Sequence, residues 1–251
     1  MYLYNNQNLN LTQNHIQLLK TKKRIRNDAH VSFRSNVALR HQSIKFLMDV
    51  QITLYSLNVM LIFEDQTMEL DVCIKGRRSV RSYTDEPVSK EQIETVLEAG
   101  TWAPTAMHRE PLRFIVIEDK KLIKYVSDET KILVKQMMPP YAEQFSTDAD
   151  VICYNAPTLI LICTEKDKQW ANVNLLDSVL AAENMFLKAY ELGLGSCYMG
   201  FVVLLNSKPD VLKKIGVPEN YEMTVPLILG HPKTKQGAGK RNKPDILKWI
   251  K

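Results

Sequence analysis

The sequence predicts an α+β domain in which helices pack against a sheet. Segments with helical and strand patterns are mixed along the chain without strict alternation, and no segment repeats at a fixed period. A chain of 251 residues with 45% hydrophobic residues is long enough for one large core, or for a domain with an appendage. The helices and strands that predict this domain all lie after residue 67.

Glycine and proline divide the chain into two parts. All 9 Gly and all 11 Pro lie at or after Gly76, and a folded domain needs such residues for its turns. We therefore expect residues 68–251 to form the main domain. Residues 1–67 are expected to be a helical or disordered extension, a targeting segment, or translated upstream sequence outside the natural product. Within them, polar residues interrupt the apolar stretch Phe46–Phe63, which favours a packed element over a membrane span.

Five segments of the main domain carry helix signals. Ser89 and Gln92 fit a capping box at the start of one helix, which Pro104 ends. Ile93, Val96, Leu97 and Gly100 lie along one face of that helix. The other predicted helices are Glu69–Lys75, Lys120–Met138, Asn174–Leu192 and a segment from Ser207 to Ile215.

Three segments have the composition of strands. Arg113–Glu118 and Met223–Leu229 are rich in β-branched and other apolar residues. Thr158–Thr164 is a continuous apolar run, as expected for a strand that is buried on both faces.

The stretch Gly76–Tyr83 is the strongest candidate for a binding site. In an extended segment Arg77, Ser79 and Arg81 would point the same way. Two guanidinium groups beside a hydroxyl match the oxygens of an organic phosphate. A solvated basic patch and a nucleic-acid surface use the same residue types.

Several further motifs follow this stretch in a fixed order, and together they resemble the nitroreductase family of FMN-dependent oxidoreductases over residues 68–251. The motifs are Ala103–Ala106, Pro111, Phe114–Val116, Gly193–Gly200, Leu229–Pro232 and the basic run Lys233–Lys243. The resemblance implies a nitroreductase-like fold, which is a mixed central sheet flanked by helices in an intertwined homodimer with the flavin at the interface.

The resemblance also implies roles for individual residues. It assigns the FMN phosphate and ribityl chain to Arg77, Arg78, Ser79 and Arg81, with Lys240 and Arg241 returning to the phosphate. It assigns the flavin ring to Pro104, Thr105, Ala106, His108 and Met199, with the backbone N–H of Gly200 near flavin N5. A donor at that position would stabilise charge on the reduced ring.

The loop after Ala106 departs from the common family pattern. His108 stands where an asparagine is usual, and Glu110 stands where a neutral amide is usual. Imidazole can still donate a hydrogen bond to the flavin, and it can titrate near neutral pH. A specialised substrate is therefore compatible with this loop.

The resemblance implies an enzyme that passes a hydride from NADH or NADPH through flavin N5 to a nitroaromatic, quinone or enone. One pocket would serve both substrates, so ping-pong kinetics are expected, and no protein nucleophile is required. The alternatives are a dehalogenase, azoline oxidase or flavin-breakdown enzyme of the same fold, or a non-catalytic flavin-binding redox sensor.

Other partners are disfavoured by composition. The net charge of +5 is modest and the basic clusters lack interleaved aromatic residues, so nucleic acid is not expected. The histidines and the four widely spaced cysteines show no ligand spacing, so no metal is expected. Free thiols and a polar N-terminus favour a cytoplasmic location.

Overall fold

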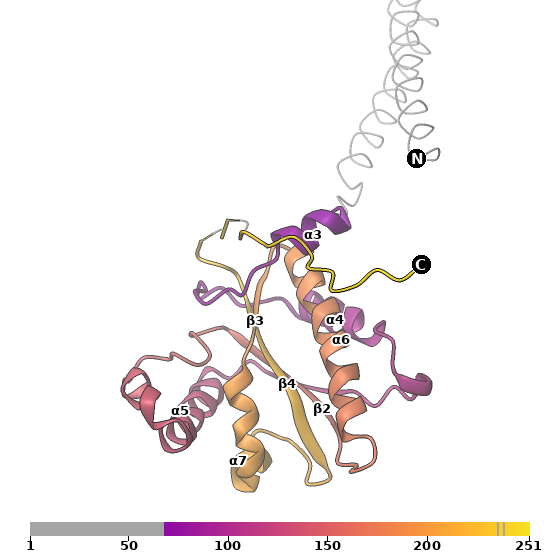
Figure 1. Ribbon diagram of the computed structural model, residues 1–251. Coiled ribbons are helices and arrows are strands. Elements are labelled where there is room, and N and C mark those ends of the chain that lie inside the picture. The colour runs from indigo at the N-terminus through magenta and orange to yellow at the C-terminus, as the bar shows by residue number, and fades with distance from the viewer. Residues whose placement is uncertain (1–67, 235, 238) are drawn as a thin grey trace, which may run out of the picture. The chain divides into compact units, whose positions relative to one another are not determined.

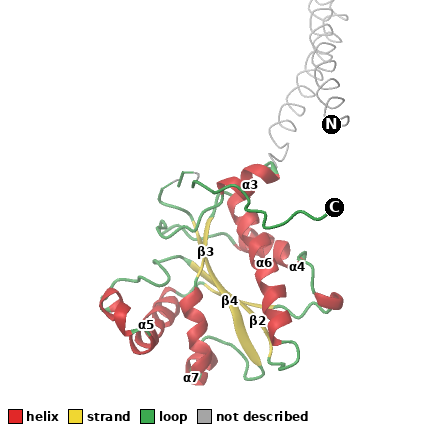
Figure 2. Cartoon of the chain, in the orientation of Figure 1, coloured by secondary structure: helices red, strands yellow, loops and turns green. Residues whose placement is uncertain are grey.

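The structure is a computed structural model, and it describes residues 68–234, 236–237 and 239–251. The expectations for residues 1–67, including the stretch Phe46–Phe63, lie outside the described residues. Figures 1 and 2 show a central sheet with helices on both faces. The α+β prediction is therefore confirmed.

The sheet contains four strands in the order β1–β2–β4–β3. All three strand pairings are antiparallel. The resemblance implies a mixed sheet, and the described residues differ in this respect. Their single parallel contact is an isolated bridge between Ser79 and Ser196 of β3. The strands are β1 (Arg113–Ile117), β2 (Thr158–Glu165), β3 (Gly195–Tyr198) and β4 (Tyr221–Gly230).

Side chains of β2 alternate between the two faces of the sheet, and each face packs against its own apolar cluster. Leu159 and Leu161 pack into one apolar cluster, which includes residues of α5 and α7. Ile160 and Ile162 pack into a second cluster, which includes residues of α4 and α6. Because successive side chains of a strand point to opposite faces, a strand between two helical layers is apolar throughout. The prediction that this strand is buried on both faces is confirmed.

The helices begin and end close to the predicted positions. At the start of α4, Ser89 Oγ accepts a hydrogen bond from the backbone N–H of Gln92 at 3.2 Å, and Gln92 Oε1 accepts one from the N–H of Ser89 at 3.1 Å, so the capping box is confirmed. The α-helices of the described residues are α3 (Leu70–Gly76), α4 (Lys90–Thr101), α5 (Lys120–Met137), α6 (Ala171–Glu191) and α7 (Pro209–Lys214). Three 3-10 helices accompany them, namely η1 (Ala106–His108), η2 (Pro139–Phe145) and η3 (Gly200–Ser207).

Helix α6 buries a face of small and polar residues. Asn174, Asp177 and Ser178 are buried, together with Ala181 and Ala182. The apolar residues that predict this helix are divided between its two sides. Met185 is fully buried, whereas the side chains of Leu175, Leu176, Val179 and Leu180 are exposed. The first half of α6 therefore presents an apolar stripe, made of these last four residues, away from the core of its own chain.

The described part of the chain contains no helix that is long and apolar enough to cross a membrane.

Candidate functional site

The basic segment, residues 77–83, lies between β3 and the chain that follows β4. The backbone N–H of Val80 donates to the carbonyl of Ser196 at 3.0 Å, and that of Lys233 donates to the carbonyl of Ser82 at 3.0 Å. A Cβ on Gly195 would lie 2.8 Å from Cβ of Val80. Glycine at position 195 is therefore what allows the basic segment to lie directly on β3.

Arg77 faces helix α6. Its Nε lies 3.4 Å from Glu183 Oε1, but the geometry is not that of a hydrogen bond, and this buried Nε has no hydrogen-bond acceptor. A buried donor without an acceptor is unfavourable, and most such donors in proteins are paired. Arg77 therefore fits an additional anionic ligand, and the oxygens of a phosphate group would satisfy it.

Arg78 faces the C-terminal tail. Its Nε donates to the carbonyl of Gly237 at 3.0 Å. A Cβ on Gly239 would lie 2.9 Å from Nη1 of Arg241 and 3.8 Å from Nε of Arg78. Arg78 and Arg241, which are far apart in the sequence, thus meet at the same tight stretch of backbone. Lys240 is exposed beside them, and its carbonyl accepts a hydrogen bond from Arg241 Nη1 at 3.0 Å.

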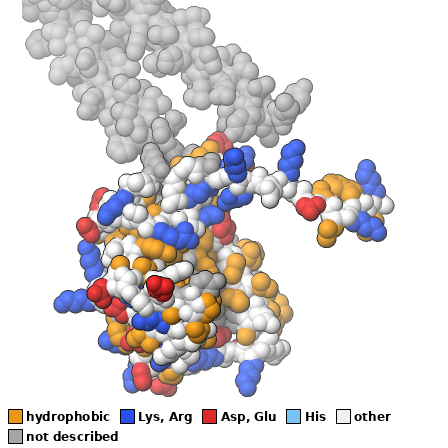
Figure 3. Space-filling model, turned by 60° about the vertical axis from the view of Figure 1, so that its left-hand side comes forward, with side chains coloured by type: hydrophobic (Ala, Val, Ile, Leu, Met, Phe, Trp, Pro, Cys, Tyr) orange, Lys and Arg blue, Asp and Glu red, His pale blue; other side chains and the backbone are white. Residues whose placement is uncertain are grey.

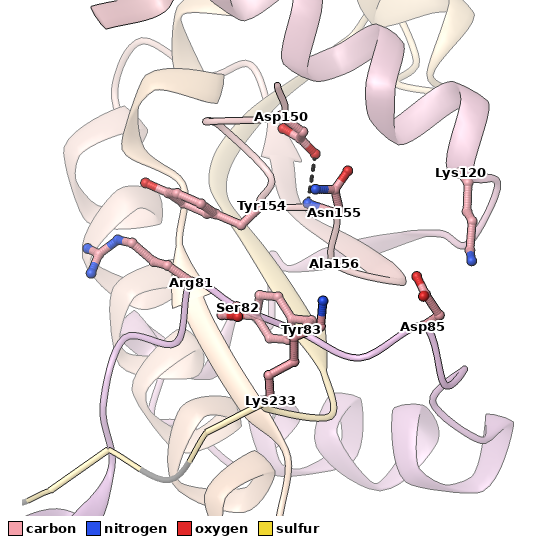
Figure 4. A pocket seen from close by; sticks show the side chains of 10 residues that line it. All are labelled: Arg81, Ser82, Tyr83, Asp85, Lys120, Asp150, Tyr154, Asn155, Ala156 and Lys233. Carbon is pink, nitrogen blue, oxygen red and sulfur yellow. Dashed lines mark hydrogen bonds between the residues drawn. The ribbon is translucent and has the colours of Figure 1, made fainter. Parts of the chain in front are cut away.

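Arg81 lines a pocket of about 370 Å³. Figure 4 shows its side chain beside Tyr154, and the Arg81 guanidinium carbon lies 6.0 Å from the centroid of the Tyr154 ring. Asp150 ties the segment that contains Tyr154 to α5, because its carboxylate accepts hydrogen bonds from Ser127 Oγ at 2.6 Å and from the backbone N–H of Asn155 at 2.9 Å. Arg81 therefore lies at this pocket, whereas Arg77 lies beside α6 and Arg78 beside the C-terminal tail.

The pocket also contains residues that the sequence analysis does not select. Tyr83 is buried in its floor, where its hydroxyl donates to the carbonyl of Val80 at 2.6 Å and burial raises the pKa of its phenol far above the ordinary value. Lys120 and Lys233 contribute two further cations. In the sequence, Lys233 stands out only as the first residue of the basic run. Nothing but its place at a helix start distinguishes Lys120.

The second predicted group lies in a loop, residues 104–110, that contacts the first half of α6. The backbone N–H of Ala106 lies 3.2 Å from both carboxylate oxygens of Asp177. Thr105 Oγ1 accepts a hydrogen bond from the N–H of Glu110 at 3.1 Å, which closes the loop on itself. His108 is exposed, and its Nε2 lies 3.0 Å from Glu110 Oε1. The two departures from the family pattern thus face each other as a pair.

The third predicted group follows β3. Met199 is buried in the core, and its backbone N–H donates to the carbonyl of Pro226 at 2.9 Å. Gly200 is the first residue of η3, so its N–H has no partner within that helix. The backbone N–H of Gly200 is therefore available to a ligand, while the Met199 side chain is held in the core.

The basic segment and the loop border different parts of α6. Arg77 lies beside Glu183, and Gly76 lies so close to Tyr190 that a Cβ at position 76 would overlap the tyrosine hydroxyl. The loop around Ala106 instead contacts Asp177, near the other end of the helix. Within one chain, the basic segment and the loop are thus held at different ends of α6.

In residues 68–234 and the described tail, no three His, Cys, Asp or Glu side chains come together in a way that could hold a metal ion. The four cysteines are free and buried.

Known proteins with similar sequences indicate the family of this chain. Residues 74–231 match the family model described as "Nitroreductase family". A relative from Archaeoglobus fulgidus, provisionally named an NADH dehydrogenase/NAD(P)H nitroreductase, is 30% identical over 191 residues, covering 72% of this chain and all of that protein. The FMN reductase (NADPH) of Bacillus subtilis is 27% identical over 177 residues, which cover 67% of this chain and 68% of the reductase.

Solved structures agree with the sequence relatives. The nitroreductase of Bacteroides fragilis, solved with bound FMN, has a TM-score of 0.61 and 30% identity, covering 74% of this chain and 98% of that one. The nitroreductase of Desulfitobacterium hafniense has a TM-score of 0.65 at 24% identity, covering 73% of this chain and all of that one, which supports the fold. The family model spans more than half of the chain, and the chain therefore belongs to the nitroreductase family.

Proposed function

We propose that this protein is an FMN-dependent oxidoreductase that passes a hydride from NAD(P)H to an electron-poor acceptor. The observation that carries the proposal is the buried Nε of Arg77, which has no hydrogen-bond acceptor. Arg77 belongs to the same segment as Ser79, which is bridged to Ser196 of β3. Family relatives named NAD(P)H nitroreductase and FMN reductase support the same activity.

The cofactor assignment is supported by the solved relative that holds FMN. In this chain Arg77, Arg78, Ser79 and Arg81 would hold the phosphate and ribityl chain, with Lys240 and Arg241 closing over the phosphate. Pro104, Thr105, Ala106 and His108 would border the ring, and the free N–H of Gly200 would donate to it. When bound, FMN supplies the hydride chemistry, and the protein supplies binding, orientation and hydrogen-bond donors.

The acceptors that we propose are nitroaromatics, quinones or enones, reduced in a ping-pong cycle. NADH or NADPH would leave the flavin face before the acceptor occupies it, because one open face serves both. The paired His108 and Glu110, which lie 3.0 Å apart, would shape the entrance for a specialised substrate.

We also propose a homodimer with the flavin between the subunits. The apolar stripe of α6 supports it, since Leu176 and Val179 are 63% and 50% exposed in the single chain. The C-terminal tail supports it too, because Leu247, Trp249 and Ile250 are exposed there, and Figure 3 shows the hydrophobic side chains gathered on this tail. Exposed apolar groups of this kind mark association surfaces. Light scattering of the FMN-bound protein that gives a monomer would contradict the dimer.

The location that we propose is cytoplasmic. All four thiols are free and buried, as is usual in a reducing compartment. Fractionation that finds the protein outside the cytoplasm would contradict this.

The test of the function is an absorption spectrum of the purified protein, recorded before and after anaerobic addition of NADPH and then NADH. We expect flavin bands that bleach with a pyridine nucleotide and return when a quinone or nitroaromatic is added. A protein that binds FMN but is not reduced would instead be a flavin-binding sensor. A colourless protein that takes up no added FMN would contradict the proposal.

A further inference from the structure

The loop at residues 104–110 has an unusual backbone. Met107, His108 and Glu110 have φ angles of 53°, 54° and 48°. Residues other than glycine seldom adopt this left-handed conformation, and they keep it where their surroundings enforce it. Met107, His108 and Glu110 are therefore held in this conformation by contacts from elsewhere in the fold.

Asp177 supplies one of these contacts. Its side chain is buried at 4% exposure, and both carboxylate oxygens lie 3.2 Å from the N–H of Ala106. Among the described residues no Lys, Arg or His makes an ion pair with it. A buried carboxylate without a cation is unfavourable, so its presence in the small-residue face of α6 is explained by the loop rather than by the core.

Arg109 supplies the second contact, from the side of the loop. Its Nη1 donates to Oδ1 of the buried Asn174 at 3.2 Å, and its guanidinium carbon lies 4.2 Å from the centroid of the Trp170 ring. Trp170, Asn174 and Asp177 are spaced four and three residues apart, so they lie on one face at the start of α6. Asp177 thus holds the first half of the loop at Ala106, and Trp170 and Asn174 hold the second half at Arg109. These contacts form a clamp on the loop.

We propose that Asp177 and Arg109 are positioning residues for the redox reaction. They hold the backbone of Pro104–Ala106 and the direction of His108 in the geometry that borders the flavin. The inference rests on the proposed function, because the contact between this loop and the flavin is part of that proposal. The contacts of Asp177 and Arg109 are with the loop and with α6, so in this proposal both act through the loop.

The test compares Asp177→Ala and Asp177→Asn with a matched control, Asn184→Ala. The Asn variant keeps an oxygen that can accept the Ala106 N–H, whereas the Ala variant leaves that N–H without a partner. Asn184 also lies on α6, and its Nδ2 donates to the carbonyl of Ala99 at 3.2 Å, away from the loop. The control therefore removes a similar bond between α6 and a neighbouring element.

Two readouts are needed. Hydrogen exchange of residues 103–112 in the FMN-free protein measures the loop directly. Steady-state kinetics and visible circular dichroism of the FMN-loaded protein measure its consequence. For Asp177→Ala we expect faster exchange at Ala106, an altered flavin dichroism, and a kcat lower by about tenfold to 100-fold with a smaller change in KM. Asp177→Asn should restore most of each signal, and Asn184→Ala should lower the melting temperature without changing them.

Equal exchange and equal kinetics in Asp177→Ala and the control would overturn the proposal. If Asp177→Ala does not fold, Arg109→Gln tests the same clamp, since Arg109 is exposed and its replacement leaves the core intact. A normal dichroism and kcat in that variant would overturn the proposal equally. A wild-type protein that binds no FMN would contradict the proposed function, and the exchange measurement would then still decide whether Asp177 holds the loop.

Discussion

The basic segment at residues 77–83 and the loop at residues 104–110 are both irregular, yet the fold holds them by different means. Backbone hydrogen bonds to β3 and to the chain after β4 hold the first, as in Val80 N–H to the Ser196 carbonyl at 3.0 Å. Side chains of α6 hold the second, through Asp177 and Asn174. The position of the basic segment therefore depends on backbone hydrogen bonds, whereas the shape of the loop depends on side chains of α6.

The largest effect should come from removing the close approach in the first region. In Gly195→Ala the new Cβ would lie 2.8 Å from Val80 Cβ, so the basic segment has to move off β3. We expect unfolding free energy to fall by about 1–3 kcal/mol, as for other overpacked sites, and FMN binding to be lost. Urea unfolding and an FMN titration measure both.

The same variant has an internal control and a local reporter. Adding Val80→Gly removes the Cβ and both methyl groups that the new side chain would meet, so it should recover part of the FMN binding. Burial raises the pKa of the Cys197 thiol on β3, under the basic segment, so a displaced segment should make this thiol more reactive toward Ellman's reagent. Unchanged FMN affinity in Gly195→Ala would show that the segment does not depend on backbone contact with β3.

The second effect concerns an arginine side chain of the basic segment. Arg77→Gln removes the buried guanidinium donor, and hydrogen bonds to charged groups contribute about 1.5–3 kcal/mol. The dissociation constant for FMN should therefore rise roughly tenfold to 100-fold, with little change in melting temperature of the FMN-free protein. Fluorescence titration with FMN gives the constant.

A conservative replacement sharpens this prediction. Arg77→Lys keeps the charge but loses the planar fork, so its affinity should fall between the wild type and Arg77→Gln. Arg113→Gln is the control, because Arg113 is exposed and its side chain donates to the nearby carbonyls of Glu110 and Leu112, away from the basic segment. Equal FMN affinity in the wild type and Arg77→Gln would remove Arg77 from the site.

The two regions also differ in how far the sequence predicts them. Local signals suffice where partners are near in sequence, and the capping box of Ser89 and Gln92 is confirmed in detail. The arginines and Ser79 stand out by composition alone. The clamp on the loop does not, since Asp177 meets Ala106 from 71 residues away, and nothing near Met107 signals a left-handed backbone. The apolar residues of α6 predict a helix but not that Leu176 and Val179 face away from the core.

The smallest effect tests the loop from within. Thr105→Val keeps the shape of the side chain but removes the oxygen that accepts the Glu110 N–H at 3.1 Å. A neutral hydrogen bond contributes about 0.5–1.5 kcal/mol, so exchange at Glu110 should rise modestly while the basic segment keeps its protection. Thr105→Ser retains the hydroxyl and should match the wild type. If Thr105→Val instead loosened residues 77–83 as much as the loop, the two regions would form one cooperative unit, and the distinction between backbone-held and side-chain-held segments would fail.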